Sequence, residues 1–113
     1  MFDIDTGAVR HLAAQLTERA AEIRAVAADL ARQVTAVPWE GRAADAMREL
    51  AGLRLAALAR VADLHDDAAE ALDRHADAVD ATLRLIATVE STVEQTADHA
   101  VDSVVDHTIG LLR

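Results

Sequence analysis

The side chains of this chain that could take part in chemistry are mainly carboxylates. Six of them alternate at spacings of three and four residues, so they would share one face of a helix: Asp63, Asp66, Glu70, Asp73, Asp77 and Asp80. We call this set the acidic stripe. It is either a solvated helix face or a docking surface for an arginine-rich partner, and we expect it to face away from the apolar core.

The other polar residues give little support for catalysis. His99, Asp102 and Asp106 would share one helical face, but the Glu-x-x-His pairs of carboxylate-bridged bundles and the His-Glu-x-x-His motif are missing. Ser91 and Ser103 lie in helical patterns without the sharp turn of a nucleophile elbow, and the chain has no Cys. We therefore expect no enzyme activity, no cofactor and no bound metal.

The composition predicts an all-α fold. Of the 113 residues, 52% are hydrophobic and 2% aromatic, with four Gly and one Pro, which suits helices packed closely through Ala and leaves too few turn residues for an all-β fold. The net charge of −9 resides in residues 61–113, which hold twelve acidic residues and three Arg. This acidity argues against a nucleic-acid or anionic membrane partner.

No pattern for membrane insertion or signal-peptide export is found. No apolar run approaches the ~18 residues that a membrane span needs. The N-terminus lacks the basic and apolar segments of a secretory signal peptide. We therefore expect a cytoplasmic protein that leaves the cell only by another route.

Two helical patterns are separated by one turn, and together they predict a single helical-hairpin domain over residues 1–113. The first helix is expected at about 6–35, with Asp5 as its N-cap. The second is expected at about 42–80 with a helical extension over about 81–109.

The second pattern is unusually long, because no Pro or Gly lies between Leu53 and Ile109. It forms either one long helix or a helix that breaks within 77–82 or 88–92 and folds back. We favour the long helix, whose uncovered length would pair with another chain in a four-helix bundle or coiled-coil dimer.

Apolar residues at seven-residue spacing mark the face that each helix would bury. The expected bundle interface consists of Leu12, Leu16, Ile23, Leu30, Leu58, Leu72, Val79, Ile86 and Val93. His65 and His75 fall in or beside this face. Each is either a hydrogen-bonded histidine at the core edge or a pH-sensitive switch.

The only strong turn spans residues 37–41 and contains Trp39, Glu40 and Gly41. The indole either covers the ends of both helices or projects outward as an anchor for a partner, and we favour the anchor. Gly41 is needed either for a positive φ or for close helix approach.

These features resemble the WXG family, the small early-secreted-antigen-like proteins of bacterial type VII (ESX) secretion. The resemblance lies in the chain length, the Trp-x-Gly turn between two Ala-rich helices, and the run Gly41-Arg42-Ala43-Ala44-Asp45-Ala46-Met47 after the turn. The opening Phe2-Asp3-Ile4-Asp5 and Leu12-Ala13-Ala14-Gln15-Leu16 are similar to the EspC-like branch. The resemblance covers residues 1 to about 80.

The resemblance implies a non-enzymatic secreted substrate or a targeting partner of a larger effector. It implies a homodimer or a heterodimer with another helical hairpin or with the N-terminal helical domain of an effector, and contact of the turn with the secretion machinery. The family's export signal, Tyr-x-x-x-Asp/Glu, is missing because the chain has no Tyr, so export would depend on a partner. The alternative is a cytoplasmic acidic adaptor or immunity protein that binds a basic toxin.

Overall fold

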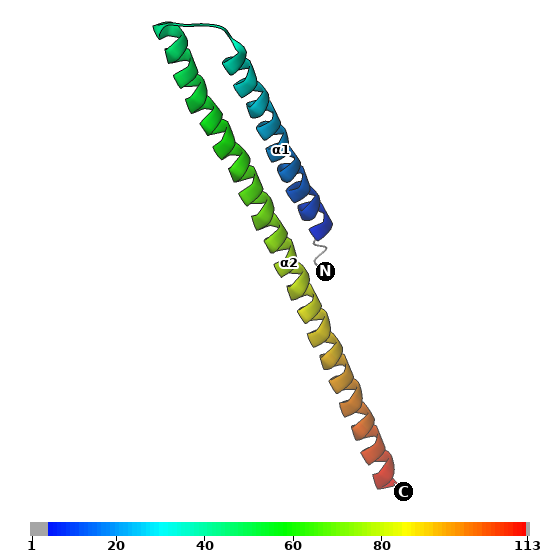
Figure 1. Cartoon of the computed structure of the whole chain (residues 1–113). Coiled ribbons are helices and arrows are strands. Elements are labelled where there is room, and N and C mark those ends of the chain that lie inside the picture. The colour runs from blue at the N-terminus through cyan, green and yellow to red at the C-terminus, as the bar shows by residue number, and fades with distance from the viewer. Residues whose placement is uncertain (1–4, 113) are drawn as a thin grey trace. The chain divides into compact units, whose positions relative to one another are not determined.

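The computed structural model describes residues 5–112, which form two helices joined by one turn. Helix α1 spans Thr6–Ala36 and helix α2 spans Arg42–Leu112. The first part of α2 runs antiparallel to α1 (Figure 1). The predicted all-α helical hairpin is thereby confirmed, whereas Phe2, Asp3 and Ile4 of the family-like opening lie outside the described residues.

The ends of α1 follow from local chemistry. The side chain of Asp5 accepts a hydrogen bond from the backbone N–H of Ala8 at 3.2 Å, as expected of an N-cap. Val37 adopts an extended conformation (φ −69°, ψ 119°), because the residue before a proline is sterically driven out of the helical region. The helix therefore ends at Ala36, directly before Val37 and Pro38.

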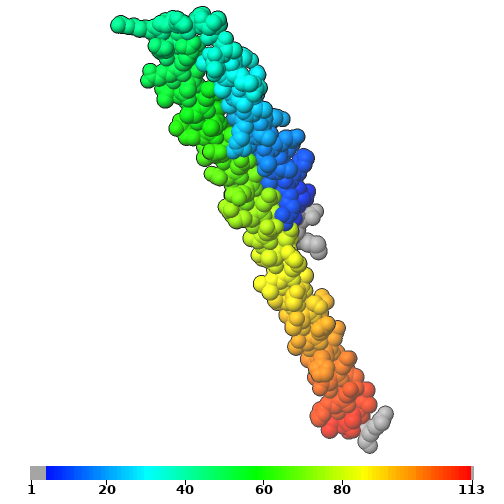
Figure 2. All heavy atoms as spheres, viewed as in Figure 1, coloured from blue at the N-terminus to red at the C-terminus, as the bar shows by residue number. Residues whose placement is uncertain are grey.

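The contacts within the chain divide it into two units, and the boundary falls between Ala76 and Asp77. The first unit contains α1 and the first half of α2. Figure 2 shows the atoms of α1, in blue to cyan, against those of the green part of α2. The second unit, described to Leu112, is the remainder of α2.

The core of the first unit is built from alanine alone. Every buried residue in the described chain is an Ala, with at most 4% of its surface exposed: Ala13, Ala20, Ala44, Ala62, Ala69 and Ala76. Two seven-residue series, one on each helix, account for five of them, and we call these five (Ala13, Ala20, Ala62, Ala69 and Ala76) the alanine seam. A side chain of one methyl group lets two helices approach closely, but it buries little apolar surface.

The second unit has no buried residue in its described part, yet it is helical throughout. The hydroxyl groups of four threonines each donate to the carbonyl oxygen four residues earlier, at 2.8–2.9 Å: Thr82, Thr88, Thr92 and Thr96. These bonds occupy the hydroxyl groups within the helix. Helix α2 continues through 77–82 and 88–92, and the expected long second helix is present.

Candidate protein-binding surfaces

The turn between the helices is held by one arginine. The guanidinium of Arg48 donates through Nη2 to the carbonyl oxygens of Val37, at 3.3 Å, and of Trp39. Asp45 lies 3.7 Å from Nη1 of the same guanidinium. Arg48 thus satisfies two carbonyl groups of the turn, that of the C-cap residue Val37 and that of Trp39.

Gly41 supplies the backbone conformation that starts α2. Its φ is +103°, a value that side-chain-bearing residues rarely adopt, and its carbonyl oxygen accepts the backbone N–H of Asp45 at 3.0 Å. A Cβ atom at Gly41 would meet no other atom within 4 Å. Of the two sequence-based explanations for this glycine, the positive φ is therefore correct and close helix approach is not.

The side chain of Trp39 is 57% exposed. An indole that covered the ends of both helices would lose most of its accessible surface, so the exposure favours the outward-projecting anchor over the cap. Glu40 is exposed beside it. The turn consequently presents a large apolar group on a backbone fixed by Arg48.

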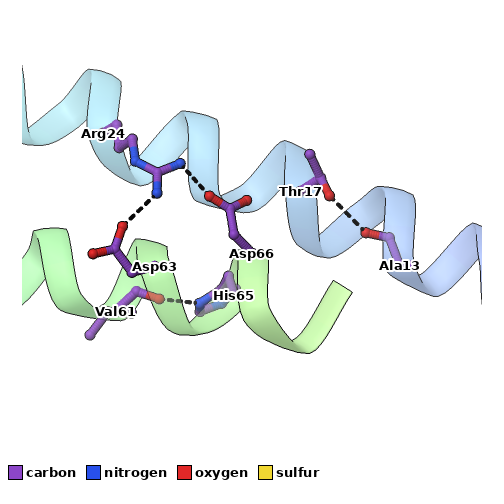
Figure 3. Close-up of polar contacts among 7 residues, drawn as sticks. All are labelled: Ala13, Thr17, Arg24, Val61, Asp63, His65 and Asp66. Carbon is purple, nitrogen blue, oxygen red and sulfur yellow. Dashed lines mark hydrogen bonds and ion pairs between the residues drawn. The ribbon is translucent and has the colours of Figure 1, made fainter. Parts of the chain in front are cut away.

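One flank of the first unit carries an ion-pair bridge between the helices (Figure 3). Arg24 of α1 donates to Asp63 at 2.8 Å and lies 2.7 Å from an oxygen of Asp66, both on α2. Hydrogen bonds to Asp63 and Asp66 raise the pKa of Arg24 above its ordinary value. Because that pKa is far above neutrality in either state, the bridge gives no pH dependence through Arg24 in the physiological range.

The expectation that the acidic stripe faces away from the core is therefore wrong for Asp63 and Asp66. The physical reason is that the core is centred on Ala62 and not on Leu58, four residues earlier. We call Leu58 and the residues that follow it at seven-residue spacing the Leu58 series. Residues one and four positions after Ala62 lie beside the alanine seam, where they reach α1. Glu70 and Asp73 are exposed and form no ion pair within residues 5–112, whereas Asp77 and Asp80 do interact with other groups.

The opposite flank is apolar. Ile23 follows Ala20 by three residues and Arg24 follows it by four, so Ile23 and Arg24 lie on opposite sides of the alanine seam. An open groove on this side is lined by Glu22, Ile23, Val26 and Leu58. The apolar flank, as we call it, comprises Ile23, Val26, Leu58 and Val61, of which Val26 and Val61 are 56% and 41% exposed.

The predicted interface residues divide into two groups. Five are half-buried, and they flank the alanines instead of forming the centre of the core: Leu16, Ile23, Leu58, Leu72 and Val79. Four are exposed, by 41–60%: Leu12, Leu30, Ile86 and Val93. Sequence reasoning missed the hydrogen bonds of Arg48 to the turn, because they depend on how the turn folds back towards α2. It missed the bridge at Arg24, because that depends on which residues of the two helices lie opposite each other.

The histidines show no arrangement for chemistry. The Nδ1 atom of His65 lies 2.7 Å from the carbonyl oxygen of Val61, one turn back, and the residue is half-buried. His75 is exposed. Among the described residues no three His, Asp or Glu side chains are grouped as a metal site. Within the same part of the chain, no helix combines the length and the apolar character needed to cross a membrane.

Comparisons with protein-family models, with curated proteins and with solved structures gave no match to this chain. Its function must therefore be inferred from the turn, the two flanks and the exposed apolar residues of α2.

Proposed function

We propose that this protein is a partner-binding component of a bacterial type VII secretion system. It acts without catalysis, as a secreted substrate or as a targeting partner of a larger effector. The observation that carries the proposal is an exposed tryptophan on a Trp-x-Gly turn held by Arg48, at the end of an antiparallel hairpin with exposed apolar side chains on one flank. The resemblance to the WXG family includes the same turn.

The thin core supports a role in binding. A hairpin whose only fully buried side chains are alanines and whose larger apolar side chains are at most half-buried gains little from the hydrophobic effect. A partner that covers the apolar flank would stabilise it. Val26 and Val61 are the side chains with most to gain, because each is apolar and more than 40% exposed. The expected occupant is another helical hairpin or the N-terminal helical domain of an effector.

The proposal is tested by an export assay in a bacterium with an active type VII system. The chain is expressed with its genomic neighbours, with and without a functional secretion ATPase. We expect the wild-type protein in the medium only when the ATPase is active, or its partner's export to depend on the chain. Absence of both effects in every combination of neighbours would reject a role in secretion.

Two variants separate the turn from the flank. Trp39→Ala should abolish export while the chain still binds its partner, because Trp39 belongs to the turn and not to the apolar flank. Val26→Glu should abolish partner binding, because it places a charge among apolar groups. Ala25→Glu is the matched control, since Ala25 is exposed and lies next to Val26 on the outer side of α1.

The alternative of an acidic adaptor for a basic toxin receives less support. Arg24 already occupies Asp63 and Asp66, so a basic partner would have to displace an internal arginine or use the remainder of the acidic stripe. Reversal of Glu70 and Asp73 to Arg distinguishes the two functions. It should leave a hairpin partner bound, whereas it should release a partner held by the acidic stripe.

A further inference from the structure

The second unit carries two heptad series whose members from Ile86 onward are all exposed. The first series continues the spacing of the alanine seam and consists of Leu83, Glu90, Ala97, Val104 and Leu111. The second continues the Leu58 spacing and consists of Val79, Ile86, Val93, Ala100 and His107. Ile86, Val93, Val104 and Leu111 are 47%, 60%, 65% and 74% exposed.

We propose that residues 86–111 of α2 form an antiparallel coiled coil with the same residues of a second copy of this chain. In an antiparallel pair of helices, a member of one series meets a member of the other. The interface is also two-fold symmetric, so each contact occurs twice. One register then pairs Ile86 with Leu111, Glu90 with His107, Val93 with Val104, and Ala97 with Ala100.

Every layer of this register is matched in size or in charge. The outer layers place a large apolar residue against another, as in Ile86 with Leu111. The centre places Ala97 against Ala100, which allows the two helices to approach closely. The only two polar members of the interface, Glu90 and His107, meet each other, and an imidazole N–H can donate to a carboxylate.

Other arrangements leave Glu90 without a partner. A shift by one heptad towards the centre of the partner helix places Glu90 against Ala100. A parallel pair places Glu90 against Glu90. Because an unpaired charge in a helix interface is costly, the Glu90–His107 pair specifies both direction and register.

The remaining charges are compatible with this self-association. Asp98, Asp102 and Asp106 fall at heptad positions on the outer side of the helix, away from both series. Glu94 is the one other charged residue next to Glu90 along the interface. In the proposed register it lies opposite Val101 and Thr108 of the second copy, and no like charge faces it.

This inference is independent of the proposed secretion role, because it concerns residues 86–111 and not the turn or the apolar flank. The proposed partner is a second copy of the chain, because the paired residues of the two copies match in size and in charge. The test therefore needs only the purified full-length chain.

Disulfide trapping tests the register directly, since the chain contains no Cys. The full-length variants Val93→Cys and Val104→Cys are purified separately, mixed and treated with a mild oxidant. We expect a cross-linked dimer in the mixture and little in either variant alone, because these two residues face each other across the interface and each lies far along the helix from its own copy. Cross-linking of Val93→Cys alone, or a monomer by light scattering at all concentrations, would overturn the proposal.

A charge exchange provides an independent check that does not depend on cysteine chemistry. Glu90→His places two imidazoles together and His107→Glu places two carboxylates together, so each should weaken the dimer at least tenfold. The double variant restores a Glu–His layer and should recover wild-type association. Failure of the double variant to recover, with the helical circular dichroism unchanged, would contradict the antiparallel register.

Discussion

At the scale of single residues, Trp39 combines an exposed indole with a backbone fixed by Arg48. Trp39→Ala should change the free energy of unfolding by no more than ~0.5 kcal/mol, as is usual for surface substitutions. Thermal unfolding of the purified protein measures this change. The fluorescence of this single tryptophan should be red-shifted and easily quenched, and a blue-shifted, protected emission would show that the indole is buried.

Gly41 and Gly52 form a natural comparison between two glycines. Gly41→Ala should destabilise the chain by about 1–2 kcal/mol, because alanine is strained at a φ of +103°. Gly52→Ala should stabilise it by about 0.5–1 kcal/mol, because Gly52 lies inside α2 with open space where the Cβ would be added. Chemical denaturation of the three proteins gives the difference. Equal effects at the two positions would mean that the turn does not constrain Gly41.

At the scale of the helices, the alanine seam sets how closely α1 and α2 approach. Ala20 has 0% of its surface exposed, so Ala20→Leu forces the helices apart and should cost about 1–3 kcal/mol. Ala25→Leu is the control, because Ala25 is exposed and leucine is nearly as good a helix former as alanine. Melting temperatures measure both variants. If Ala20→Leu and Ala25→Leu have the same melting temperature, the helices do not pack through the alanine seam.

The bridge at Arg24 contributes orientation more than stability. Arg24 is 46% exposed in its side chain, and surface ion pairs add little to stability because water and salt screen them. Its two partners lie on α2, one turn apart, so the bridge fixes which flank of α2 faces Arg24. It does not by itself select one register, because Glu70 and Asp73 repeat the same spacing seven residues later.

At the scale of the whole molecule, the charge and the apolar surface act in opposite directions. The net charge of −9 disfavours association of identical chains, while the uncovered apolar residues favour it. Raising the salt concentration from about 0.05 M to about 0.5 M should therefore strengthen self-association, because it screens the repulsion. Light scattering after size exclusion measures the mass at each salt concentration. A monomer at micromolar concentration in both buffers would contradict this expectation.

The sequence by itself was sufficient for the local features of the chain. The all-α hairpin, the N-cap at Asp5 and the turn before Pro38 depend on residues within a few positions of each other, so spacing and backbone sterics determine them. The continuity of α2 was only favoured from the sequence, and the structure decided it by showing one helix over Arg42–Leu112.

Only the tertiary structure decided which residues form the core. The heptad pattern contained both the Leu58 series and the Ala62 series, and spacing cannot tell which of two adjacent series lies at the point of closest approach. The packing of α1 against α2 selected the alanines, and it thereby moved Asp63 and Asp66 from an expected outer face to the side of the seam. That choice depends on the alignment of residues some forty positions apart, which no local pattern encodes.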